Sequence, residues 1–179
     1  MPFDVRTLGE FPGESLPEET GDSYAVNALL KARAAARHTG LLALGDDSGL
    51  EVDALGGNPG LRSARFGGPG LDDAGRCARL LAALDGVEEA RRGARFRCVV
   101  ALVDSGRSEH VVEGAAEGVI LTAPRGRGGF GYDPLFYYPP LGKTFAELSE
   151  KEKARVSHRG RALEAVRRLL RECYTADSG

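Results

Sequence analysis

The sequence predicts an α/β fold in which a mixed central β-sheet is flanked by helices. Segments with a helical repeat of apolar residues alternate along the chain with short strand-like runs. Two β-rich runs, 96–103 and 109–121, are joined through the turn sequence Asp-Ser-Gly-Arg at 104–107, which predicts an antiparallel hairpin. Such a hairpin argues against a purely parallel, doubly wound sheet.

Five elements are expected in the first half of the chain. Helices are predicted where small or apolar residues repeat every three to four positions between a capping side chain and a terminating glycine. Strands are predicted where apolar residues form a short run or alternate with polar ones. In order, these are a short strand at 3–7, a helix that Asp22 or Ser23 caps and Gly40 ends, a buried strand at 41–44, a strand at 50–55, and a helix from Asp72 to Gly86.

The second half is expected to hold the hairpin and then return to helix. Two long glycine-rich loops, 56–70 and 124–133, interrupt the regular elements. Ser149 precedes a charged segment that its hydroxyl can cap. In order, the expected elements are strands at 96–103 and 109–121, an aromatic strand at 135–138, a short charged turn from Ser149 to Val156, and a helix from about Arg159.

Size and charge exclude several classes of protein. The 179 residues suffice for a single domain, 1–179, with a buried core, and 42% hydrophobic with 28% charged residues is a globular composition. Because no apolar run approaches the roughly 20 residues of a membrane helix and no signal pattern is present, we expect a cytoplasmic protein without a membrane partner. A net charge of −2, with arginines dispersed among acids, gives little support to an RNA-binding protein, so no nucleic-acid partner is expected.

The three cysteines predict neither a zinc site nor a disulfide framework. Cys77, Cys98 and Cys173 are an odd number, widely spaced and without a close pair. We therefore expect them to be reduced core residues of a cytosolic protein.

Two acidic segments are candidates for a metal site. Asp46 and Asp47 follow a predicted strand, and carboxylates at such a strand end lie where α/β proteins commonly place ligands. Glu18 and Glu19 precede the first helix. Hydrated carboxylates suit Mg²⁺, which takes a few of them together with substrate phosphates. The alternatives are a solvated turn for the aspartates and a polar lead-in to the helix for the glutamates.

A second candidate is the sequence GGFGYDP, 128–134. Glycines on both sides of Phe130 let a flat ligand ring reach the backbone and an aromatic face. Downstream, Lys153, His158 and Arg159 form a cationic cluster suited to phosphates or a keto oxygen. Taken singly, a Gly-Phe-Gly turn and a lone histidine are usually structural. Together with the acidic segments, they indicate a nucleotide phosphohydrolase.

Three stretches resemble the inosine triphosphate pyrophosphatase family, the Ham1-like pyrophosphatases of non-standard purine nucleoside triphosphates. They are 18–32, EETGDSYAVNALLKA, 45–68, GDDSGLEVDALGGNPGLRSARFGG, and 128–163, which begins GGFGYDPLFYYPPLGKTFAEL. The resemblance implies hydrolysis of XTP, ITP and dITP to the monophosphate and pyrophosphate, Mg²⁺ dependence, a homodimer, and two lobes with a substrate cleft.

The same resemblance implies roles for single residues. Asp47 would be the general base and, with Glu19, a metal ligand, while Ser48 would contact the substrate. A base-binding set would comprise Phe130, Gly131, Tyr132, Asp133, Lys153, His158 and Arg159. In such a pocket, an arginine or histidine that donates to the 6-keto oxygen would reject adenine, whose 6-amino group cannot accept.

The sequence departs from the family's pattern at its start. The family opens with a strand and a phosphate-binding loop that enters a helix, and about 20 residues of that unit are not found before Met1. We expect the 179-residue form to turn over ITP poorly and a longer form to restore activity. The alternative is a catalytically weak relative that binds nucleotides without turnover.

Overall fold

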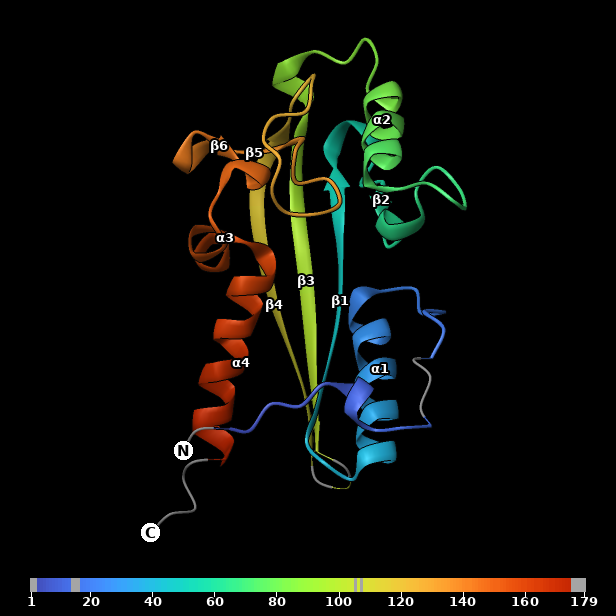
Figure 1. The fold of residues 1–179 in the computed structure, drawn as a ribbon, viewed down its shortest axis with the longest axis vertical. Helices are drawn as coiled ribbons and strands as arrows, with labels where there is room; N and C mark the ends of the chain where they lie inside the picture. Colours follow the sequence, from blue (N-terminus) through green and yellow to red (C-terminus); the bar gives the residue numbers. More distant parts are fainter. Residues whose placement is uncertain (1–2, 14–16, 105, 107, 175–179) are drawn as a thin grey trace. The chain divides into compact units, whose positions relative to one another are not determined.

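The structure is a computed structural model that describes residues 3–13, 17–104, 106 and 108–174. Within these residues there are four α-helices and six β-strands (Figure 1), and some of the segments that connect them contain short 3-10 helices. The helices are α1 (Tyr24–Thr39), α2 (Asp73–Ala83), α3 (Glu150–Val156) and α4 (His158–Tyr174). The strands are β1 (Ala43–Val52), β2 (Pro59–Gly60), β3 (Gly93–Asp104), β4 (Ser108–Ile120), β5 (Phe136–Tyr138) and β6 (Lys143–Thr144).

The six strands of the described segments form one antiparallel sheet in the order β2-β1-β3-β4-β5-β6. Leu50 of β1 faces Gly60 of β2, and Ile120 of β4 faces Phe136 of β5. The α/β class is therefore confirmed, whereas the mixed sheet was expected and an antiparallel one is found. The reason is that short hairpin-like connections join most neighbouring strands, and a parallel pair needs a long crossover.

The chain divides into two compact units, which we describe separately. Unit 1 takes its described residues from 1–47, 99–113 and 162–179, and unit 2 from 48–98 and 114–161. Strands β1, β3 and β4 and helix α4 contribute residues to both. That residues 1–179 act as one ITPase-like domain stays a prediction.

Unit 1 is built on the close approach of α1 to β1. The Ser23 side chain accepts from the Val26 amide at the start of α1, and Gly40 ends the helix in the left-handed conformation, as predicted. The face of α1 that packs inward is rich in alanine, with Ala28 and Ala32 fully buried. Figure 1 shows α1 and α4 on the two sides of the strands of this unit.

Gly45 of β1 is required by this packing. A Cβ atom at Gly45 would lie 2.5 Å from the Ala28 carbonyl oxygen and 2.6 Å from the Ala32 amide nitrogen. Because both neighbours are helix backbone, Gly45→Ala should force β1 away from α1 and lower the free energy of unfolding by about 1–3 kcal/mol. Chemical denaturation measures this.

The matched control is Gly9→Ala, since a Cβ at Gly9 would find its nearest neighbour, Thr7 Oγ1, at 3.9 Å. This variant should stay within about 0.5 kcal/mol of the parent. Equal stability of the Gly45→Ala and Gly9→Ala variants would contradict the tight packing of α1 on β1.

Unit 2 holds an aromatic core. The rings of Phe96 and Phe136 lie 4.7 Å apart between centroids, and Phe145 lies 4.7 Å from Phe136. Such tilted pairs add to the free energy gained from burial alone. Helix α2 begins at the predicted cap, where the Asp72 side chain accepts from the Gly75 amide at 2.7 Å, and it buries Cys77 and Leu80.

Several strand expectations are corrected. Residues 3–7 form no strand, because a strand needs a paired neighbour and this segment is not part of the sheet. The strands expected at 41–44 and 50–55 are a single strand, β1, because the GDDSG stretch continues as extended backbone with alternating burial instead of turning. The two-residue strands β2 and β6 were missed, since they are too short to show alternation.

Other expectations have mixed outcomes. Cys77 and Cys98 are buried as predicted, but Cys173 is exposed on α4. The strands of the predicted hairpin are neighbours in the sheet, while Ser105 and Arg107 of its turn lie outside the described residues. In the part of the chain that the structure describes, no helix has the length and apolar character needed to cross a membrane.

Candidate active site

In unit 1, two of the predicted carboxylates meet at a lysine that had not been predicted. Lys31 Nζ of α1 donates to Glu19 Oε1 at 2.8 Å and lies 3.7 Å from Asp47 Oδ1 of β1. The Lys31 side chain is only 14% exposed, so its charge is partly shielded from water. Two carboxylates from separate segments therefore converge on one cationic position.

Asn27 orients this acidic cluster of Glu19, Lys31 and Asp47. Its side-chain amide donates to Asp47 Oδ2 at 2.9 Å, and its Oδ1 accepts from the Gly21 amide at 2.8 Å. Asn27 and Lys31 are four residues apart on α1 and so lie on one helix face. The hydrogen bond to Asp47 Oδ2 orients the carboxylate so that its Oδ1 faces Lys31. The hydrogen bond from the Gly21 amide attaches the segment that carries Glu19 to the helix.

Asp47 lies in the middle of β1 and not at a strand end. Alternation along the strand puts the side chains of Asp46 and Asp47 on opposite faces, so the two aspartates do not form the pair that the sequence suggested. Asp47 is 9% exposed, and its hydrogen bond from Asn27 compensates part of the cost of burying a carboxylate.

In unit 2, Phe130 and four other predicted residues come together. The ring is 61% exposed, with Lys153 Nζ 4.5 Å and Arg159 Cζ 5.9 Å from its centroid. Lys153 Nζ also forms an ion pair with Asp133 Oδ2, and Arg159 Nη2 donates to Ser48 Oγ at 3.2 Å. An aromatic face with two adjacent cations is a surface that can stack a base and bind its oxygen atoms.

Asp133 connects the loop to this surface. It is 2% exposed, and its Oδ2 accepts from the Phe130 amide at 2.8 Å as well as from Lys153. The carboxylate therefore holds both the backbone beneath the ring and the cation beside it.

Two other predicted residues point into the core. Tyr132 is buried, its hydroxyl donates to the Ser63 carbonyl at 2.8 Å, and burial raises the pKa of its phenol. The His158 ring is 5% exposed and stacks on Phe96, with 4.6 Å between ring centroids. In this structure both side chains contact core residues next to the site. That either of them contacts a base directly stays a prediction.

Comparison with known proteins shows the family of this chain. The Ham1 family model matches residues 1–169. A dITP/XTP pyrophosphatase of Desulforamulus reducens is 52% identical over 172 residues, which cover 96% of this chain and 86% of that protein. The corresponding protein of Gloeobacter violaceus is 58% identical over 162 residues, covering 90% and 79%. This chain belongs to the Ham1 family.

The fold of the Ham1 family is confirmed by a solved structure. The HAM1 protein from Coxiella burnetii is 45% identical, covers 89% of this chain and 82% of its own, and superposes with a TM-score of 0.83. The expected resemblance to the inosine triphosphate pyrophosphatases is thus correct at the level of family and fold.

Lys31 and Asn27 are the residues of this Ham1 chain that sequence reasoning missed. A signal for Lys31 existed, because the chain has only four lysines among 24 basic residues. Lys153 is another of these four lysines. An amide and an ammonium four residues apart on a predicted helix would have been a second signal.

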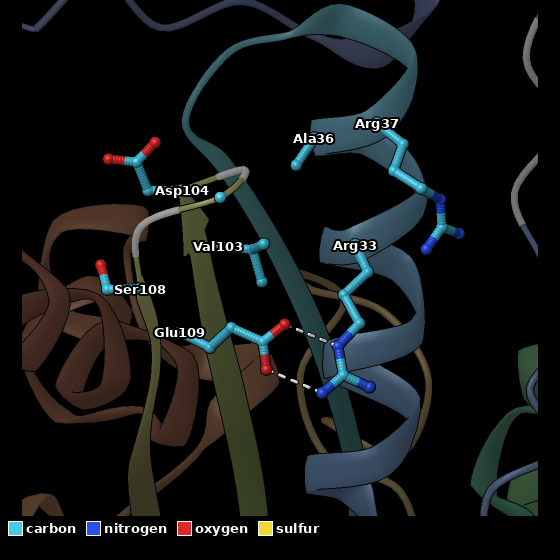
Figure 2. Close-up of a pocket in the computed structure, with 8 residues that line it drawn as sticks. Arg33, Ala36, Arg37, Val103, Asp104, Ser108 and Glu109 are labelled. Atoms are coloured by element: carbon cyan, nitrogen blue, oxygen red, sulfur yellow. Dashed lines mark hydrogen bonds and ion pairs between the residues drawn. The ribbon is translucent and has the colours of Figure 1, made fainter.

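A pocket of about 430 Å³ in unit 1 contains none of the predicted site residues. Figure 2 shows that the Arg33 guanidinium in this pocket faces the Glu109 carboxylate, while Arg37 points away from the pair. Arg33 Nε and Nη2 donate to the two Glu109 oxygens, each at 2.7 Å. Because this cation is already neutralised, we do not include the pocket in the candidate site.

Proposed function

We propose that the protein hydrolyses non-standard purine nucleoside triphosphates, XTP, ITP and dITP, to the monophosphate and pyrophosphate. The observation that carries the proposal is the convergence of Glu19 and Asp47 on Lys31, in a chain whose relatives are named dITP/XTP pyrophosphatases. Carboxylates can hold the metal ion that assists attack on a phosphate, and a nearby ammonium can stabilise the charge that develops.

The acidic cluster fits Mg²⁺ by the chemistry of its donors. Mg²⁺ prefers carboxylate oxygens and usually keeps several waters, with only one or two carboxylates from the protein. Glu19 and Asp47, which converge on Lys31, would be the protein's two ligands, and within the described residues no group of three or more His, Cys, Asp or Glu side chains gathers. When bound, the metal would lower the pKa of a coordinated water and polarise a phosphoryl oxygen.

Asp47 is the residue that we assign as general base. Asn27 donates to Asp47 Oδ2 and so fixes the orientation of the carboxylate, with Asp47 Oδ1 on the side of Lys31. In this orientation the carboxylate would take a proton from the attacking water. The Lys31 ammonium would then stabilise negative charge that develops on the phosphate oxygens.

The aromatic loop would bind the base. A purine would stack on the exposed Phe130 ring, and the Arg159 guanidinium, held by Ser48, would donate to the 6-keto oxygen. Adenine carries an amino group at this position and would leave the guanidinium without an acceptor, which disfavours ATP.

Location and assembly are part of the same proposal. Free cysteines, two of them buried, agree with a reducing compartment and hence with the cytoplasm. A homodimer is what the family resemblance implies, and sedimentation equilibrium would measure it.

The test is incubation of the purified protein with ITP and Mg²⁺, followed by assay of inosine monophosphate and pyrophosphate. We expect both products in equal amounts, with much slower release from ATP. Release of inorganic phosphate instead of pyrophosphate would overturn the proposal. Tight ITP binding without turnover would favour the alternative, a nucleotide-binding relative without catalytic activity.

Phe130→Ala tests the stacking surface. Loss of base stacking should raise KM for ITP by an amount equivalent to about 1–3 kcal/mol. Because the ring is 61% exposed, the melting temperature should hardly change. Phe145→Ala is the matched control, since Phe145 is 1% exposed and its loss should cost about 3–5 kcal/mol of stability. An unchanged KM in Phe130→Ala would remove Phe130 from the site.

A further inference from the structure

The loop that presents Phe130 is attached to helix α2. The Gly131 amide donates to Asp73 Oδ2 at 2.6 Å, across 58 residues of sequence. Cys77, one helical turn further along α2, lies with its Sγ 3.4 Å from the Gly131 carbonyl oxygen. Burial raises the pKa of the Cys77 thiol to about 11, so the thiol is protonated near neutral pH and can donate this bond. Both backbone groups of Gly131 are therefore engaged by α2.

This attachment matters because glycines on both sides of Phe130 give the loop backbone conformational freedom. Gly129 and Gly131 both have positive φ, at 71° and 59°, a region that glycine enters freely. Without outside contacts, these two residues would let the peptide units on either side of Phe130 rotate. Asp133 holds the Phe130 amide on one side, and Asp73 holds the Gly131 amide on the other.

Asp73 is itself held in place by an ion pair. Arg76 Nη2 lies 2.5 Å from Asp73 Oδ1, and Arg76 Nη1 donates to the Leu71 carbonyl at 2.5 Å. One Asp73 oxygen thus faces Arg76 and the other faces Gly131. The hydrogen bond from Gly131, followed by that from Arg76, lowers the pKa of the Asp73 carboxyl, so the charged form that accepts both bonds is favoured.

We propose that Asp73 is a positioning residue for base recognition, which fixes the Gly131 backbone and thereby the direction in which the neighbouring Phe130 ring is presented to the purine. The proposal rests on the proposed function and extends it to α2, which carries none of the residues that the family resemblance implies. Asp73 acts through Phe130 and makes no contact with the base.

The chain offers a close internal control for a merely structural role. Asp72 and Asp73 are consecutive carboxylates at the start of α2, but Asp72 caps the helix by accepting from Gly75, while Asp73 reaches the loop. Asp72→Ala should lower the melting temperature and leave KM for ITP within about twofold, since its bond lies inside the helix.

Asp73→Ala should raise KM for ITP roughly tenfold with little change in kcat, because the stacking contact is made in both the ground state and the transition state. Asp73→Asn keeps an acceptor for Gly131 and should recover most of this loss. A role of Asp73 as a negative charge at the helix start would instead be lost equally in both variants. Equal KM values for Asp73→Ala and Asp73→Asn would overturn the proposal.

A double-mutant cycle shows whether Asp73 acts through Phe130. In a Phe130→Ala background, Asp73→Ala should no longer change KM, because there is no ring left to position. If the two changes multiply instead, Asp73 contributes by another route and the proposal is wrong.

A second measurement needs no nucleotide and separates this proposal from the proposed function. The chain contains no tryptophan, so Phe130→Trp places a single tryptophan on the loop, whose fluorescence can be excited selectively over that of the five tyrosines. Asp73→Ala in this background should lower the anisotropy of the tryptophan and increase its quenching by acrylamide, while Asp72→Ala should do neither. Unchanged anisotropy and quenching in Asp73→Ala would show that Asp73 does not hold the loop and would overturn the proposal. Absence of ITP hydrolysis by the parent protein would overturn only the proposed function.

Discussion

Asp47→Asn should lower kcat for ITP by about 10²–10⁴-fold, the usual contribution of a general base, while ITP binding changes little. The asparagine side chain keeps the size of aspartate and can still accept from Asn27, so the local packing of β1 and α1 should persist. It cannot take a proton, and its neutral amide is a poor partner both for Lys31 and for a divalent cation. Steady-state kinetics at saturating ITP and Mg²⁺, together with calorimetric titration of the nucleotide, measure the two effects separately.

Glu51→Gln is the matched control for this substitution. Glu51 is also a carboxylate on β1, but it pairs with Arg97 at 3.3 Å in unit 2 and has no part in the acidic cluster. We expect its kcat to stay within about twofold of the parent, as is usual for residues that make no transition-state contact. If Asp47→Asn keeps a near-normal kcat, Asp47 is not the general base.

Asp133→Ala should have the largest effect on stability among the site residues. The substitution leaves the Lys153 ammonium, whose side chain is 17% exposed, without its carboxylate, and it also removes the acceptor of the Phe130 amide. Breaking a buried pair costs several kcal/mol, and we expect about 3 kcal/mol here, at the lower end of the range because Lys153 keeps some contact with water. Chemical denaturation measures this loss, and KM for ITP should rise in parallel.

Two further variants show whether the unpaired charge is the cause. Asp133→Asn combined with Lys153→Met removes both charges and should regain part of the stability that Asp133→Ala loses. Asp53→Ala removes the carboxylate of an exposed pair with Arg95, at 3.3 Å, and should cost no more than about 1 kcal/mol. Similar losses for Asp53→Ala and Asp133→Ala would show that burial of the Lys153 pair contributes nothing.

Local features of the fold could be predicted from the sequence with good accuracy. The caps at Ser23, Asp72 and Ser149 are all found, and Gly40 ends α1 as expected. Each of these depends on hydrogen bonds between residues three or four positions apart, so the necessary partners are visible in a short window of sequence. The prediction of the strands was less accurate. β1 was divided in two because its polar middle, Asp46 to Ser48, resembles a turn, and only the alternating burial in the folded chain shows it to be extended.

The sequence by itself determined the family and named the residue types of the candidate site, because the motifs around Asp47 and Phe130 are long and ordered. Only the tertiary structure decided how these residues are used. Lys31 lies between Glu19 and Asp47, Arg159 contacts Ser48 across 111 residues, and Asp73 holds Gly131 across 58. The physical reason is that a carboxylate pairs with the donor that the packing of helices and strands brings within about 3 Å. This donor can be far away in the sequence, so the spacing of neighbouring residues does not predict it.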